Sequence, residues 1–129
     1  MSNPSTISFD PEGGPLSVKL QFNGLLVAGY ELSAIQGDDI TPYFSQTGSN
    51  AESSEIDVAL PGTAAEHQGA VLMLTIKLEP LDRSAASKYE AGFSLQQDGQ
   101  DCGGDSAFGE FGDSIVSVDL VGLMEPQYA

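Results

Sequence analysis

Five carboxylates lie close together in a glycine-rich segment between residues 98 and 113. Calcium prefers about six to eight oxygen ligands from carboxylates, carbonyls and water, and glycines allow backbone carbonyls to turn toward an ion. The spacing differs from that of an EF-hand, and a chain with this many acids places several of them in any long loop, so a solvated loop is the alternative. We therefore expect a loop over residues 98–114, with these candidate calcium ligands: Asp98, Asp101, Asp105, Glu110 and Asp113.

Residues for nucleophilic catalysis are scarce. Such catalysis needs a Ser or Cys with a histidine base and an acid that orients the base. The chain has one cysteine, Cys102, and one histidine, His67. Acids around Cys102 should raise the pKa of its thiol, which suppresses the thiolate, and we expect His67 to be an exposed loop residue. Carboxylate pairs of the glycosidase kind are defined by their separation in space, which no sequence pattern reports. We predict that the chain is not an enzyme.

The acidic segment resembles part of a known family. The stretch DGQD, followed by GDSIVSVDL, is similar to the acidic loop and adjoining strand of the small calcium-dependent bacterial lectins. Those lectins are β-sandwiches that bind sugar through calcium held in a loop, so the resemblance implies calcium and carbohydrate as ligands. This chain has CGGDSAFGEF where the lectins have a compact cluster of Asp and Asn, and the ligand positions of the family are not carried over.

Two phenylalanines, Phe108 and Phe111, lie among glycines in the same segment. Exposed rings in a polar loop cost free energy unless another group covers them. We favour a loop that folds back, so that both rings close one end of the domain. In the alternative, the rings contact another protein, because aromatic anchors inside a polar rim carry most of the energy of many interfaces. Tyr43 and Phe44 are the other aromatic residues that we expect in loops and count as interaction candidates.

The net charge of −15 excludes several partners. A field of that sign repels phosphate backbones and anionic lipid, so we expect binding to neither nucleic acid nor membrane. No apolar run approaches the roughly 18 residues that span a bilayer, and the first residues lack a basic and an apolar signal region, so we expect a soluble, cytoplasmic protein. A single cysteine excludes an internal disulfide and the cysteine-rich zinc sites. The alternative explanation of this acidity is that it keeps the protein soluble and has no role in a site.

Alternation of apolar and polar residues is the main structural signal, and it indicates half-buried strands. A chain of 129 residues fits one domain, which we place over residues 1–129. Segment 70–79 is apolar on one face throughout and on both faces in its first half, so we place it at the centre of the core. The strands are expected over these segments: 6–9, 15–22, 24–35, 40–44, 54–60, 70–79, 88–96 and 114–123.

The connections between these segments are rich in Gly, Pro, Asn and Asp, which favour turns. Asn23-Gly24 is a strong hairpin signal, so we expect residues 16–22 and 25–35 to pair directly. Pro42 places segment 40–44 at a sheet edge, and short turns at residues 63–68 and 82–88 are the only helical candidates. The sequence therefore predicts an all-β fold, an antiparallel β-sandwich of the jelly-roll or Ig-like kind with seven or eight strands. Alternation alone is equally compatible with a barrel.

These observations favour a non-catalytic β-sandwich that acts as an interaction or assembly module. Its contacts would be edge strands and the 98–114 loop, and its partner another protein or a second copy of the chain. This function needs no cofactor. The alternative is a calcium-dependent ligand-binding module, with carbohydrate as a candidate ligand, that uses the acidic 98–113 segment.

Overall fold

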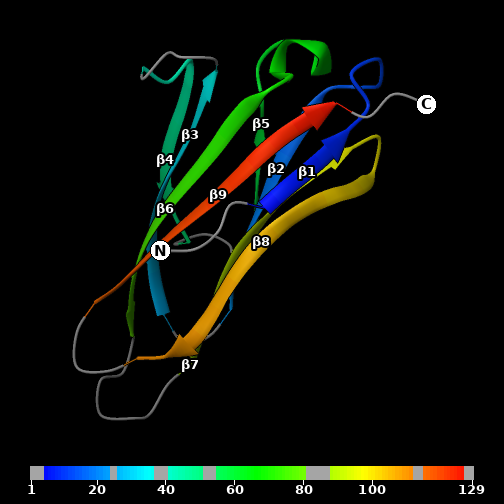
Figure 1. Ribbon diagram of the computed structural model, residues 1–129. Coiled ribbons are helices and arrows are strands. Elements are labelled where there is room, and N and C mark those ends of the chain that lie inside the picture. The colour runs from blue at the N-terminus through cyan, green and yellow to red at the C-terminus, as the bar shows by residue number, and fades with distance from the viewer. Residues whose placement is uncertain are drawn as a thin grey trace.

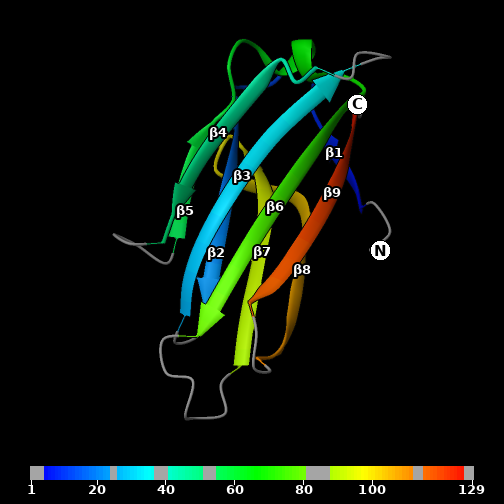
Figure 2. The same cartoon turned by 90° about the vertical axis from the view of Figure 1, so that its left-hand side faces the viewer.

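Two β-sheets packed face to face make up the computed structural model, which describes residues 5–23, 26–36, 41–50, 55–80, 88–111 and 115–126 (Figures 1 and 2). The five-stranded sheet has the order β1-β9-β6-β3-β4, and the four-stranded sheet has the order β5-β2-β7-β8. Neighbouring strands are antiparallel, except that β1 runs parallel to β9. The strands are β1 (Ser5–Phe9), β2 (Leu16–Asn23), β3 (Leu26–Gln36), β4 (Phe44–Ser49), β5 (Glu55–Ala59), β6 (Ala70–Pro80), β7 (Lys88–Gln97), β8 (Gln100–Glu110) and β9 (Val116–Pro126).

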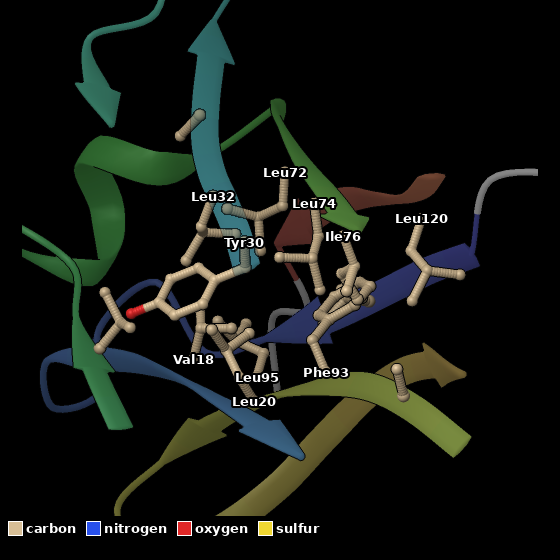
Figure 3. Close-up of a cluster of buried hydrophobic side chains, with 14 of the residues drawn as sticks. Val18, Leu20, Tyr30, Leu32, Leu72, Leu74, Ile76, Phe93, Leu95 and Leu120 are labelled. Carbon is tan, nitrogen blue, oxygen red and sulfur yellow. The ribbon is translucent and has the colours of Figure 1, made fainter. Parts of the chain in front are cut away.

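The predicted all-β sandwich is confirmed, with nine strands among the described residues instead of seven or eight. The inner faces follow the alternation in the sequence, as the buried side chains of β6 show: Leu72, Leu74, Ile76 and Leu78 are each 1% exposed or less. They pack toward side chains of β2 and β7 from the other sheet (Figure 3). Strand β6 lies between β9 and β3 in the middle of its sheet, as expected for the centre of the core.

The predicted hairpin between β2 and β3 is wrong. Strand β2 pairs with β5 and β7, whereas β3 pairs with β4 and β6 in the other sheet. Both edges of each strand are therefore occupied, and the chain passes from one sheet to the other between Asn23 and Leu26. An Asn-Gly pair favours a tight turn locally, but the partners of a strand are decided by long-range packing of its apolar face.

The loop predicted over residues 98–114 is also wrong, because residues 100–110 form the edge strand β8. Glycines at 103, 104 and 109 lower the strand propensity of this segment, but β7 pairs with it along its whole length, with one irregularity opposite Leu95 and Gln96. The turn between the two strands is Asp98-Gly99, with φ values of 52° and 77°. Positive φ at both positions is what the two-residue turn of a hairpin requires, and Asp-Gly is a sequence signal for it.

The boundary of β4 differs from the prediction over residues 40–44. The strand begins at Phe44, after Pro42, and runs to Ser49 at the edge of the five-stranded sheet. The edge position is confirmed, and proline lacks the N–H that a ladder needs, which explains the later start. A short 3₁₀ helix, η1 (Ala64–His67), accounts for the first predicted turn, whereas the second lies almost entirely outside the described residues.

Gln97 connects the end of β7 to the β1–β2 connection. Its buried side chain donates from Nε2 to the carbonyl oxygens of Asp10 (2.7 Å) and Gly14 (3.1 Å) and accepts from the Asp10 N–H at 2.9 Å. The neighbouring Asp98 accepts a further hydrogen bond from the Gly14 N–H at 3.2 Å. These bonds fix the Asp98-Gly99 turn and with it the register of β8 against β7.

The approach of β8 to β7 at Gly104 predicts a large cost of substitution. A Cβ on Gly104 would overlap the carbonyl oxygen of Phe93, whereas a Cβ on Gly29 would meet nothing closer than the Gly48 carbonyl at 4.0 Å. We expect Gly104→Ala to lower the free energy of unfolding by about 1–3 kcal/mol. Gly29→Ala should change it by less than about 1 kcal/mol in either direction. Urea unfolding followed by circular dichroism measures both values, and equal values would contradict the close approach.

Candidate functional site

A groove of about 600 Å³ lies on the outer face of the four-stranded sheet, over strands β2, β7 and β8. Glycines at 92, 103 and 104 contribute backbone to its walls. The side chains around this space are polar. They include Lys19, Gln21, Asn23, Glu90, Ser94 and Gln96.

Lys19 stands in the groove, but its charge is already paired. Its Nζ lies 3.0 Å from Oε1 of Glu55 on the neighbouring strand. The hydrogen bond and charge of Glu55, followed by the charges of Asp57 and Asp101, raise the pKa of Lys19. The lysine is therefore a fixed positive charge surrounded by three acids, and the groove as a whole is negative.

Phe108 stands beside this groove and is 79% exposed. It lies opposite Glu90 in the β7–β8 ladder, and both side chains are exposed on the outer face. Residues in such opposite positions have Cβ atoms about 4.5–5.5 Å apart. Asn23 donates from Nδ2 to Oε1 of Glu90 at 2.9 Å, which orients the carboxylate. An aromatic ring and an oriented carboxylate therefore stand side by side.

The two phenylalanines of this segment have opposite environments, so the favoured expectation that both rings fold back is wrong for Phe108. It holds for Phe111, which packs against the core and against Tyr89 with ring centroids 5.1 Å apart. The strand conformation of residues 100–110 explains the difference, because side chains alternate between the two faces of a strand, and Phe111, directly after the strand, is an odd number of positions from Phe108. The tyrosine ring also covers Gly109, its partner in the ladder.

Tyr43 and Phe44, the other interaction candidates, do not join Phe108. Phe44 begins β4 and packs partly against the core, while Tyr43 precedes it and is 41% exposed. Strand β4 is the edge of the five-stranded sheet, and β8 lies toward β1 at the other side of the sandwich (Figure 2). The four aromatic candidates therefore do not form one surface.

His67 is buried, 1% exposed, which corrects the expectation of an exposed loop residue. Its Nε2 lies 2.7 Å from the carbonyl oxygen of Pro61, and its Nδ1 lies 2.6 Å from the hydroxyl of Tyr43. Because a carbonyl only accepts, Nε2 carries the proton and Nδ1 accepts from Tyr43. Burial raises the pKa of the Tyr43 hydroxyl, which keeps that donor protonated. With both nitrogens occupied, His67 connects η1 to β4 and does not serve Cys102 as a base.

The acidic candidates bind backbone N–H groups. Asp98 accepts from Gly14, Asp101 from Gly103 at 2.8 Å, and Asp105 from Ser106 at 2.8 Å. Glu110 is exposed at the end of β8, and Asp113 lies outside the described residues. Within the described part of the chain, no three His, Cys, Asp or Glu side chains are grouped so that they could hold a metal ion. The calcium site remains a prediction that this geometry does not favour.

The outer face of the five-stranded sheet carries a second exposed surface, which we call the apolar patch. Its residues face the same side in neighbouring registers of β3, β6 and β9: Ile35, Val71, Met73, Val121 and Leu123. Met73 is 38% exposed, so the first half of β6 is less completely covered than its sequence indicated. The apolar patch lacks the polar side chains that would orient a ligand, whereas the groove on the four-stranded sheet is surrounded by them.

The groove could not be predicted from the sequence, because its walls come from three strands whose pairing is non-local. One signal was present. Gly92 interrupts the polar positions of an otherwise regular alternating strand, and Gly103-Gly104 follows soon after in the chain. Glycine inside a strand often marks the place where a ligand or another backbone approaches closely.

The hydrogen bond between Tyr43 and His67 can be tested by removing the hydroxyl. Tyr43→Phe leaves Nδ1 of His67 without its donor, and we expect a loss of about 1 kcal/mol in the free energy of unfolding. Tyr89→Phe is the matched control, because the hydroxyl of Tyr89 makes no hydrogen bond to the described residues. Urea unfolding measures both, and an equal effect of the two substitutions would contradict this role of Tyr43.

The reactivity of the Cys102 thiol can be used to test the environment of β8. Burial, followed by the charges of Asp101 and Asp98, raises the pKa of its thiol, in the direction that the sequence predicted. Since only the thiolate is alkylated, the rate with iodoacetamide should reach half its maximum at a higher pH than for a cysteine in an unstructured peptide. Asp101→Asn should lower that pH only in part, because burial is the main cause. A midpoint at or below that of the peptide would contradict this environment.

Comparison with known proteins adds no assignment: no family model, curated protein or solved structure matches this chain. Among the described residues, no helix is long and apolar enough to cross a membrane. On the described surface, the best-defined candidate site is Phe108 with the polar groove beside it.

Proposed function

We propose that the protein is a non-catalytic interaction module, and that it binds a segment of a partner protein in the groove beside Phe108. The observation that carries this proposal is the 79% exposure of Phe108 at a groove with polar walls. Large aromatic side chains are rarely left this exposed, and aromatic anchors surrounded by polar groups dominate the energy of many interfaces. Binding would bury the ring while water remains at the rim.

The shape and lining of the groove favour a peptide segment over a small molecule. Small-molecule sites are usually pockets lined by apolar side chains with a few polar groups. Here the space lies along the surface of three strands, and amides, hydroxyls and charged groups surround it. An extended segment could follow the strands and exchange hydrogen bonds with these polar side chains over its length.

Several observations support a non-catalytic role. Both ring nitrogens of His67 are occupied, and the pKa of Cys102 is raised, so neither is prepared for nucleophilic chemistry. Asp101 pairs with Gln96, which lies six residues along β7 from Glu90. At about 3.3 Å per residue these two acids are about 20 Å apart along the sheet. Carboxylate pairs that hydrolyse glycosides are about 5–10 Å apart.

Phage display of random peptides tests the proposal without assuming the chemistry of the partner. Selected peptides should bind the wild-type protein and lose about fivefold or more in affinity for Phe108→Ser, since truncating an anchor costs more than about 1 kcal/mol. Met73→Ser is the matched control, because it removes an exposed apolar side chain from the apolar patch of the other sheet. Thermal unfolding of each variant establishes that the fold is retained.

Three outcomes would contradict the proposal. The first is that no peptide is enriched on the wild-type protein. In the second, enriched peptides bind Phe108→Ser as well as the wild type. In the third, binding is lost with Met73→Ser instead, which would transfer the function to the apolar patch on the five-stranded sheet.

A further inference from the structure

We infer that the segment bound in the groove is basic, and that one of its arginines binds between the ring of Phe108 and the carboxylate of Glu90. This inference rests on the proposed function and names the chemistry of its partner. It starts from the pairing of an exposed aromatic side chain with an exposed acid at opposite positions of two neighbouring strands.

The two side chains offer complementary contacts to one guanidinium group. A guanidinium is planar, so its face can stack on an aromatic ring while N–H groups at its edge donate to a carboxylate. Asn23 occupies Oε1 of Glu90 at 2.9 Å, and within the described residues no hydrogen bond engages Oε2. That oxygen can accept from an incoming donor. A lysine ammonium would form the ion pair but would lose the planar stacking contact.

The charges around the groove favour a positively charged ligand over a negatively charged one. Lys19 is the one basic side chain among the described walls of the groove, and its Nζ is held 3.0 Å from Glu55. It also lies near Asp57 and Asp101, which contribute to its raised pKa. An anionic segment would therefore meet a cation that is already neutralised, together with the field of a chain whose net charge is −15. A cationic segment is attracted at long range by the same field.

The length of the groove gives a spacing for a second basic residue. Glu90 and Asp101 are separated by about 20 Å along the sheet, which is about six residues of an extended chain. In an extended peptide, two residues six positions apart point to the same side. A second arginine at that distance from the first would reach Asp101 when the first lies at Glu90. An arginine three positions away would point to the opposite side.

Fluorescence anisotropy with synthetic labelled peptides tests this inference. The probe has two arginines six positions apart in an otherwise neutral Gly/Ser/Thr sequence, and its controls carry citrulline or lysine at both positions. We expect the arginine peptide to bind most tightly, the lysine peptide more weakly, and the citrulline peptide not measurably. Moving the second arginine to three positions from the first should weaken binding. Higher salt should weaken it as well, because screening acts over about 10 Å at 0.1 M.

Variants of the protein locate the binding. Phe108→Ala should weaken binding about two- to fivefold, as expected for an exposed cation–π contact. Glu90→Gln keeps an acceptor for Asn23 and removes the charge, and it should weaken binding by a similar factor. If both residues contact one guanidinium, the loss in the double variant should be smaller than the product of the two single losses. Glu31→Gln is the matched control, since it removes one exposed charge from the other sheet and should have little effect.

The inference is overturned if Glu31→Gln weakens binding as much as Glu90→Gln, because the attraction would then be a diffuse effect of net charge. Citrulline peptides that bind as well as arginine peptides would overturn it too. Different results would show that this inference fails and that the proposed function fails. Display-selected peptides that depend on Phe108 but contain no basic residue would keep the interaction module and remove only the basic partner. If no selected peptide depends on Phe108, both proposals fail.

Discussion

Phe93 of β7 lies between two glycines, one in each sheet, and these two close contacts constrain how β8 and β9 can pack against it. On its backbone side, the carbonyl oxygen occupies the space that a Cβ on Gly104 of β8 would take. On its side-chain side, the ring lies where a Cβ on Gly122 of β9 would come within 3.0 Å of it. The ring is seen within the buried cluster in Figure 3. Phe93 thus leaves no room for a side chain at Gly104 and, together with Ile7 of β1, fills the space in front of Gly122.

The outer surface follows from the same constraint. With β8 held close to β7, the register between them is fixed by the Asp98-Gly99 turn and by an irregularity between Leu95 and Gln96. This register places Phe108 opposite Glu90 and directs both outward. A slip of one residue would turn Phe108 toward the core and expose Phe111, since side chains alternate along a strand. The bonds from Gln97 and Asp98 to the β1–β2 connection therefore also determine which ring a partner can reach.

The sequence predicts the strands whose alternation is clean, such as those around Leu20 and Leu74, because burial of one face dominates their energy. It does not predict β8, whose three glycines lower the propensity, nor the placement of β2 and β3 in separate sheets. The formation of β8 and the separation of β2 from β3 depend on which other strands pair with their edges. The candidate site was harder still to foresee. The acids near Asp101 suggested a cation site, but their carboxylates accept from local N–H groups once the segment is a strand.

Acidity has two consequences in this structure, and only one of them is specific. The edge strands β5 and β8 carry Glu55, Asp57, Asp101 and Glu110, and charges on such edges oppose pairing with strands of other molecules. The same charges attract any cationic chain, but a field extending over the molecule does not distinguish one basic sequence from another. Discrimination therefore has to come from short-range contacts. At Phe108 and Glu90 a ring and an oriented carboxylate favour a planar cation, which a diffuse field cannot do.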